Sequence, residues 1–237
     1  MPIPHPVAGP SAASTPGGRP PSAALTAAEL VRLGPVVPVV VVERADDAVP
    51  LARALLRGGV RTMEITLRTA AALPALRKVA AEVPEMVVGA GTVLTPEQVA
   101  EAGEAGAGFL VSPGATPRLA RAALDSGLPF LPGAGTVSEM LALAEIGLTT
   151  IKFFPAAASG GPAYLAALAQ PLPHVTFCPT GGISAASAGE WLALPNVACV
   201  GGSWLTPAAA VRARDEATVT ALAREAAALG TADPTAA

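Results

Sequence analysis

The feature that most constrains the fold of this chain is a regular alternation of short apolar segments with longer amphipathic segments. The apolar segments are predicted strands, and they cover residues 36–42, 61–67, 86–90, 108–111, 129–131, 149–153, 175–178 and 197–200. Segments that are apolar on both faces are typical of parallel sheets that helices cover on each side. Eight strands alternating with helices predict an α/β fold, and eight strands close a TIM barrel.

Helices are predicted between the strands from their periodicity and their caps. They cover residues 46–57, 96–105, 117–126, 137–146, 162–168, 185–192 and 208–229, with another ending near 83 and a short leading helix at 26–33. Thr26 and Glu29 have the spacing of a capping box. Thr95 and Thr116 each precede a proline that suits the first helical position, and Ser184 is the expected N-cap of residues 185–192. An open doubly wound sheet is the alternative, although no G-x-G-x-x-G follows the first strand.

A single barrel fits a chain of 237 residues, with an extension at each end. Residues 25–229 are the predicted barrel domain. Residues 1–24 are rich in Pro, Ser, Ala and Gly and are predicted to be a disordered extension, and residues 230–237 a flexible tail. The first residues lack the charged start and the apolar core of a secretory signal, and no stretch reaches the ~18–20 apolar residues that span a bilayer.

Composition excludes several classes of function. The net charge of −3 lacks the basic footprint of a nucleic-acid-binding protein, so neither a nucleic-acid nor a membrane partner is expected. Cys178 and Cys199 lie in or beside predicted strands without ligand partners nearby, and they are expected to be buried thiols in a cytoplasmic protein. His5 and His174 stand apart from carboxylates. No metal site and no cofactor are therefore expected.

Lys152 is the most informative polar residue of the strands. In a TIM barrel the active site lies at the carboxyl ends of the strands. Lys152 lies there on the sixth predicted strand, between Ile151 and Phe153, and it is one of two lysines in the sequence. Lysine is seldom buried without a partner, and an apolar setting favours the neutral amine, which attacks a carbonyl carbon. One interpretation is a Schiff-base nucleophile; the others are a lysine that reaches the surface or an ion pair with Glu64.

Three polar residues lie on or after the second and third strands. Glu64 has apolar neighbours and is predicted to be a general acid and base, with a structural ion pair to Arg68 or Lys152 as the alternative. Arg68 offers a planar fork that suits a carboxylate or a phosphate, although an arginine after a strand is often a surface residue. Thr92 would add a hydroxyl donor or simply belong to a turn.

Gly-Gly steps follow the seventh and eighth strands, where TIM barrels often bind phosphate with a helix N-terminus. Gly181 and Gly182 would offer backbone N–H groups, and Ser203 would offer a hydroxyl. Either step alone could be a tight turn. With Arg68 at the other end of the pocket, the two steps predict a substrate that carries an acid at one end and a phosphate at the other.

Seven segments, in this order, resemble the 2-keto-3-deoxy-6-phosphogluconate aldolase family, which includes 4-hydroxy-2-oxoglutarate aldolase activity. They are Gly34-Pro35-Val36-Val37-Pro38-Val39, Met63-Glu64-Ile65-Thr66-Leu67-Arg68-Thr69, Gly89-Ala90-Gly91-Thr92-Val93, Ser112-Pro113-Gly114, Lys152-Phe153-Phe154-Pro155-Ala156, Pro179-Thr180-Gly181-Gly182-Ile183 and Gly201-Gly202-Ser203-Trp204-Leu205. Several motifs in order are far more specific than any one of them.

The resemblance implies that residues 25–229 are a class I aldolase domain with a (β/α)8 fold, usually a homotrimer. It implies that Lys152 is the Schiff-base lysine and Glu64 the acid and base. Arg68, with Thr92 beside it, is implied to bind the pyruvate carboxylate, and Pro113 falls among the implied substrate-binding residues.

The resemblance also implies phosphate contacts at Gly181, Gly182 and Ser203, with Thr180 near the site. The chain departs from the family pattern at Ala157, where the family commonly has Glu, and this leaves the rim of the pocket and the substrate range open. The segment before residue 26 is also longer than usual in the family.

The predicted reaction is cleavage of 2-keto-3-deoxy-6-phosphogluconate to pyruvate and glyceraldehyde 3-phosphate through a Schiff base. The expected partners are a small keto acid and a phosphorylated sugar acid. The galactonate epimer and the unphosphorylated 4-hydroxy-2-oxoglutarate are alternative substrates. A phosphosugar isomerase or epimerase would share the phosphate loops without needing the lysine, whereas a silent binding protein could have lost Lys152 or Glu64.

Overall fold

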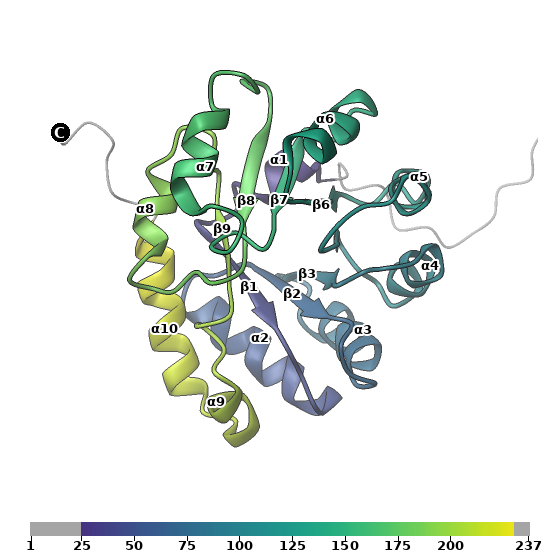
Figure 1. The fold of residues 1–237 in the computed structure, drawn as a ribbon. Helices are drawn as coiled ribbons and strands as arrows, with labels where there is room; N and C mark the ends of the chain where they lie inside the picture. Colours follow the sequence, from purple (N-terminus) through teal and green to yellow (C-terminus); the bar gives the residue numbers. More distant parts are fainter. Residues whose placement is uncertain (1–24, 230–237) are drawn as a thin grey trace, which may run out of the picture.

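The computed structural model describes residues 25–229. The predicted extension at 1–24, the predicted tail at 230–237 and His5 lie outside the described residues. An α/β fold with parallel strands is confirmed, because each strand pairing within the two sheets is parallel. Figure 1 shows the strands near the centre of the molecule and most of the helices around their outside.

Nine strands form two sheets in this part of the chain. The strands are β1 (Val36–Val40), β2 (Thr62–Thr66), β3 (Val87–Gly91), β4 (Leu110–Val111), β5 (Phe130–Leu131), β6 (Gly133–Ala134), β7 (Thr150–Phe153), β8 (Thr176–Pro179) and β9 (Val200–Gly202). One sheet has six strands in the order β5-β4-β3-β2-β1-β9, and the other has three in the order β6-β7-β8.

The fifth predicted strand, at 129–131, corresponds to β5, and beyond Pro132 the chain forms a second half, β6, that was not predicted. β5 pairs with β4, and β6 pairs with β7, so the two halves belong to different sheets. Proline has no N–H to donate to a ladder, while the carbonyl of Pro132 accepts a bond of 2.9 Å from the Lys152 N–H. The single closed sheet of eight strands expected from the sequence is therefore not formed as one continuous ladder.

The last strand lies further along the chain than predicted. Residues 197–200 were expected to form it, but β9 continues through Gly201 and Gly202, which pair with Val37 and Pro38 of β1. The Gly201-Gly202 step is predicted to follow the strand, either beside a phosphate site or as a tight turn. It forms part of the ladder instead, because neighbouring backbones supply its hydrogen bonds.

The helices agree closely with the predicted segments. They are α1 (Ala27–Leu30), the 3-10 helix η1 (Ala45–Asp47), α2 (Ala48–Arg57), α3 (Ala72–Glu82), α4 (Pro96–Glu104), α5 (Pro117–Asp125), α6 (Val137–Glu145), α7 (Gly161–Leu168), α8 (Ala188–Leu192), α9 (Ala208–Ala213) and α10 (Glu216–Ala228). The Thr26–Glu29 capping box and the caps at Thr95 and Thr116 are confirmed. None of the helices within residues 25–229 is long and apolar enough to cross a membrane.

The predicted N-cap of the eighth helix is wrong. α8 begins at Ala188, after Ser187, and not after Ser184. The Ser184 hydroxyl accepts a bond of 3.3 Å from the Ser187 N–H, so it stabilises a turn that precedes the helix.

The core has two parts. A large cluster lies between the strands and the surrounding helices. A smaller group of inward-facing side chains, the interior cluster, consists of Leu30, Val31, Val37, Phe109, Val111, Leu131, Cys178 and Cys199. Leu30 of α1 is fully buried in the interior cluster, and Figure 1 shows α1 behind the central strands. The leading helix therefore covers one end of the interior and leaves the other end for polar side chains.

Candidate active site

The structure brings Lys152 and Glu64 into contact inside the molecule. Lys152 lies on β7 and Glu64 on β2, which belong to different sheets. The Nζ atom of Lys152 is 3.4 Å from Oε1 of Glu64, and the two side chains are only 6% and 4% exposed. A buried charge is costly without a partner, so each side chain stabilises the other. An amine beside a carboxyl group is also the arrangement that proton transfer at an amine nucleophile requires.

The backbone at Lys152 is fixed from both sides. Lys152 is in register with Gly133 of β6 and with Cys178 of β8. The ring of Phe154, two residues further on, has its centroid 5.5 Å from Nζ. Sequence reasoning missed Phe154, although residues two apart on a strand point to the same face and this spacing could have found it.

Arg68 and Thr92 follow β2 and β3 and are bonded to each other. Arg68 Nε donates to Thr92 Oγ1 at 3.3 Å. Thr92 has a φ of 58°, in the left-handed region that β-branched residues rarely adopt. Such strain is typical of functional sites. Arg68 is exposed, and a guanidinium has further donors beyond the one that Thr92 accepts, in a planar fork that suits a carboxylate.

The loop after β8 is bonded to the loop that follows Lys152. The Ala156 N–H donates to the Thr180 carbonyl at 2.8 Å, and the Ala157 N–H donates to the Gly181 carbonyl at 3.0 Å. Gly181 and Gly182 have φ values of 101° and 76°, which glycine adopts without the clash that a Cβ would cause. The predicted phosphate loop therefore lies beside the segment that carries the lysine.

Thr180 and Ser203 belong to neighbouring parts of the fold. Thr180 is buried and forms a parallel bridge with Gly201, and a Cβ at Gly201 would lie 2.2 Å from Thr180 Oγ1. Gly201 therefore leaves the space that the Thr180 side chain occupies. Ser203 is exposed directly after β9, so the two predicted phosphate segments follow adjacent strands.

Pro113 lies against the strand next to Lys152. A Cβ at Gly133 would lie 2.2 Å from the carbonyl carbon and oxygen of Pro113, so the two backbones approach as closely as a glycine permits. The Ser112 hydroxyl is fully buried and accepts a bond of 3.3 Å from the Gly133 N–H. Sequence reasoning missed the role of Ser112, which a buried hydroxyl at the end of a predicted strand could have indicated.

The two cysteines are free, buried thiols, as expected from the sequence. A hydrogen bond to Cys178, together with burial, raises the pKa of Cys199 well above its usual value. Cys199 is therefore held as a neutral thiol in the interior cluster. Among residues 25–229, three or more His, Cys, Asp or Glu side chains are nowhere grouped so as to hold a metal ion.

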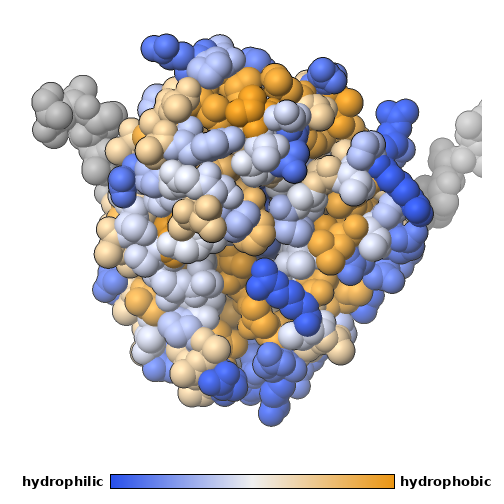
Figure 2. All heavy atoms as spheres, in the orientation of Figure 1, coloured by the Kyte–Doolittle hydropathy of each residue, from blue (hydrophilic) through white to orange (hydrophobic). Residues whose placement is uncertain are grey.

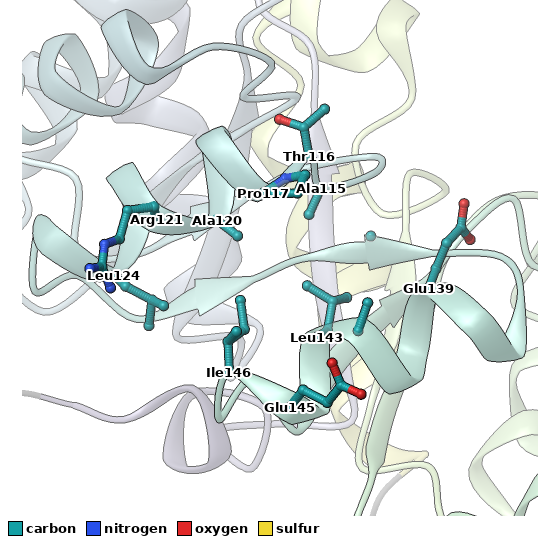
Figure 3. A pocket seen from close by; sticks show the side chains of 12 residues that line it. Ala115, Thr116, Pro117, Ala120, Arg121, Leu124, Glu139, Leu143, Glu145 and Ile146 are labelled. Atoms are coloured by element: carbon teal, nitrogen blue, oxygen red, sulfur yellow. The ribbon is translucent and has the colours of Figure 1, made fainter.

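A groove of about 720 Å³ lies outside this site, between α5 and α6. Leu124 of α5 and Ile146, the residue directly after α6, are 39% and 47% exposed and line the groove (Figure 3). Figure 2 shows hydrophobic surface around α6. Neither Lys152 nor Glu64 lines the groove, so its chemistry is separate from that of the buried pair.

Comparison with known proteins assigns the chain to a class. The sequence profile of the family described as KDPG and KHG aldolase matches residues 27–222. The KHG/KDPG aldolase of Escherichia coli K12 is 53% identical over 201 residues, which are 85% of this chain and 94% of that protein.

Two solved structures have the same fold. The KDPG aldolase of Legionella pneumophila, with pyruvate captured as a covalent carbinolamine intermediate, has a TM-score of 0.84 at 42% identity and covers 85% of this chain and 98% of its own. The 2-keto-3-deoxy-6-phosphogluconate aldolase of Zymomonas mobilis ZM4, with 3-phosphoglycerate, has a TM-score of 0.83 at 44% identity and covers 87% and 97%.

The parallel α/β fold and these relatives define the chain as an aldolase, a carbon–carbon lyase. More particularly, the chain belongs to the KDPG and KHG aldolase family.

Proposed function

We propose that this chain cleaves 2-keto-3-deoxy-6-phosphogluconate to pyruvate and glyceraldehyde 3-phosphate, with Lys152 as the Schiff-base nucleophile. The observation that carries the proposal is the buried contact of 3.4 Å between Lys152 Nζ and Glu64 Oε1. A lysine amine and a keto acid form an iminium that accepts electrons during bond cleavage. The carbinolamine of pyruvate in the Legionella relative supports the same covalent route here.

In the first half of the reaction, the neutral amine of Lys152 attacks the C2 ketone. The new N–C2 bond forms as the carbonyl oxygen takes up a proton and the nitrogen loses one, which gives a carbinolamine. Glu64 then donates a proton to the C2 hydroxyl, which leaves as water, and the iminium forms. The proton that Glu64 donates is the one that Lys152 gives up across their 3.4 Å contact when its amine becomes neutral, and its donation leaves Glu64 as a carboxylate.

In the second half, the Glu64 carboxylate takes the proton of the C4 hydroxyl, directly or through water. The C3–C4 bond breaks, its electron pair moves into the iminium to give an enamine, and glyceraldehyde 3-phosphate leaves. Protonation of the enamine at C3 restores an iminium. Addition of water to that iminium releases pyruvate and returns Lys152 as an amine.

Arg68 and Thr92 are proposed to bind the substrate carboxylate. Their bond of 3.3 Å orients the guanidinium at the end of β2, so that its remaining donors face a ligand. Pro113 is proposed to line the same pocket, because it lies against Gly133, the strand neighbour of Lys152.

Gly181, Gly182 and Ser203 are proposed to bind the phosphate, with Thr180 beside them. The left-handed glycines leave the backbone N–H groups of this loop open to close approach by an anion. The 3-phosphoglycerate in the Zymomonas relative supports a phosphorylated ligand.

A second candidate substrate is 4-hydroxy-2-oxoglutarate. The Escherichia coli relative, at 53% identity, bears the names of both activities, which favours this candidate over an isomerase. The same Schiff base would cleave it to pyruvate and glyoxylate, without the phosphate contacts at Gly181 and Gly182.

The proposed reaction is tested by assay of the purified protein with each substrate. Pyruvate is measured with lactate dehydrogenase and NADH, and the aldehyde product is measured separately. We expect equimolar pyruvate and glyceraldehyde 3-phosphate from the phosphorylated substrate. A product of unchanged mass would indicate an isomerase, and no turnover of either substrate or of the galactonate epimer by folded protein would contradict the proposal.

We also infer that the two sheets are arcs of one closed eight-stranded barrel. Residues 130–134 take part in both sheets, on either side of Pro132. At the other junction, bridges join Thr180 to Gly201 and Phe177 to Val197. The family profile over residues 27–222 supports a single domain at 25–229. The free thiols of Cys178 and Cys199 support a cytoplasmic location.

A homotrimer is proposed, with the groove between α5 and α6 as part of the contact between copies. Leu124, Val137, Leu141 and Ile146 on or beside these two helices are exposed, and exposed apolar patches mark association surfaces. Leu141→Glu should shift the mass measured by light scattering to that of a monomer. The matched change Leu94→Glu, on another exposed leucine, should leave a trimer. A monomeric wild type would contradict this assignment.

A further inference from the structure

Gly91, the last residue of β3, lies directly beneath the carboxyl group of Glu64. A Cβ built at Gly91 would lie 2.0 Å from Oε1, 2.3 Å from Cγ and 2.4 Å from Cδ of Glu64. Carbon atoms do not approach other heavy atoms so closely. The Glu64 side chain therefore occupies the space that the side chain of any other residue at position 91 would need.

The backbone conformation does not explain the glycine at this position. Several described glycines have a positive φ, including Gly181 and Gly182, but Gly91 does not. Gly91 has ordinary strand pairing, in register with Thr66 of β2. Its lack of a side chain matters for space and not for backbone freedom.

Glu64 has little room to move elsewhere. Its side chain is 4% exposed, and its Oε1 atom is held 3.4 Å from Lys152 Nζ. Its neighbour in register is Gly89, and the space above Gly89 is filled by the ring of Phe109, 2.5 Å from where a Cβ would lie. Glu64 is therefore confined between the Phe109 ring and the bare backbone at Gly91.

We propose that Gly91 is a positioning residue for the Glu64 carboxyl group. The missing Cβ lets the Glu64 side chain lie across β3 and reach Lys152. This inference rests on the proposed function and deepens it, because it concerns the proton transfers assigned to Glu64. A methyl group at position 91 would displace the carboxyl group by about an ångström or more, and such a displacement slows a positioned reaction by roughly tenfold to a hundredfold.

A double-mutant cycle tests the proposal, with Gly91→Ala, Glu64→Ala and the combined variant. Three quantities are measured for each: turnover of 2-keto-3-deoxy-6-phosphogluconate, the rate of borohydride trapping of pyruvate, and Tm. Gly91→Ala alone should lower kcat by about ten- to a hundredfold with little change in KM, because the predicted carboxylate and phosphate contacts are untouched. In the Glu64→Ala background the added methyl group fills vacated space, so it should cause no further loss of trapping rate and no further fall in Tm.

Gly89→Ala is the matched control on the same strand. The atoms nearest to its methyl group belong to the Phe109 ring, so its Tm penalty should depend much less on the residue at position 64 than the penalty of Gly91→Ala does. If Gly91→Ala is as damaging with Glu64→Ala as without it, in trapping rate and in Tm, the positioning role is overturned. If Glu64→Ala alone leaves turnover and trapping unchanged, the role assigned to Glu64 fails, and the role of Gly91 fails with it.

Discussion

The two ends of the interior differ in chemistry although the same strands build them. Leu131 of β5 belongs to the apolar interior cluster, and Gly133 of β6, two residues later, is in register with Lys152. The interior cluster is covered by α1, whereas the opposite end carries Lys152 and Glu64. In (β/α)8 barrels, the fold that is proposed for this chain, the end at the carboxyl termini of the strands supports catalysis and the other end supports stability. Substitutions at the two ends should therefore separate activity from stability.

Lys152→Arg should have the largest effect at the catalytic end. Arginine keeps the positive charge beside Glu64 but cannot supply a neutral amine. Turnover in the coupled pyruvate assay should fall by a factor on the order of 10⁴ or more, while the circular dichroism spectrum stays that of the wild type. Substantial residual cleavage in this variant would rule out Lys152 as the nucleophile.

Leu30→Ala should have the largest effect at the opposite end. Leu30 is fully buried in the interior cluster, so its truncation should lower the free energy of unfolding by about 2–5 kcal/mol. Below the melting transition, kcat should stay close to that of the wild type. The control is Arg32→Ala, at an exposed position nearby, which should change stability by less than about 0.5 kcal/mol. A stable Leu30→Ala enzyme with a much lower kcat would contradict the separation of the two ends.

Two arginines flank β2, one at each end, so substitutions of them compare the two ends of the interior on a single strand. Arg68 follows β2 near Thr92, and Arg61 precedes it; both are exposed. Arg68→Lys should lower kcat/KM by about ten- to a hundredfold, because lysine cannot form the paired bonds of a guanidinium with a carboxylate. Arg61→Lys should leave kcat/KM unchanged. Equal, small effects of both substitutions would identify Arg68 as a simple surface residue.

Glu139, at the start of α6, should show the smallest effect and a pH dependence of stability. Backbone N–H groups of Gly135 and Thr136 donate to its carboxylate and hold the pKa of Glu139 below its usual range. A lowered folded-state pKa stabilises the protein above the ordinary pKa of glutamate, and this contribution is lost as the pH falls through the folded value. Glu139→Gln should therefore cost about 0.5 kcal/mol near pH 7 and almost nothing in acid, as measured by urea unfolding.

The same substitution at the other end of α6 tests whether the stabilisation by Glu139 depends on its position at the start of the helix. Glu145 lies in the last turn of α6, where a carboxylate is unfavourable beside the helix dipole. Glu145→Gln should not lower stability at pH 7. A loss equal to that of Glu139→Gln would show that the cap contributes nothing specific.

Local patterns in the sequence predicted most elements of the fold. The threonine caps and the alternation of segments are signals that act over a few residues, so they survive in the folded chain. The division at Pro132 and the extension of β9 through Gly202 were missed because they depend on pairing with distant strands. Tertiary pairing overrides local turn chemistry at such positions.

The candidate site was predicted in outline and not in its distances. In a parallel barrel the carboxyl ends of the strands meet at one face. Lys152 and Glu64 were therefore expected at the same face, although 88 residues separate them. The roles of Phe154 and Gly91 could not be derived in the same way. They depend on where a ring centroid lies and on the space that a missing Cβ leaves, and only folded coordinates give these quantities.

The most direct test of the account is to trap pyruvate on the protein with borohydride and locate the adduct by mass spectrometry after digestion. The chain has two lysines, so the assignment is unambiguous: Lys152 is buried beside Glu64, and Lys78 is partly exposed and paired with Asp46. We expect a reduced pyruvate adduct on Lys152 and none on Lys78. Folded protein that yields no adduct, or an adduct on Lys78 alone, would contradict it.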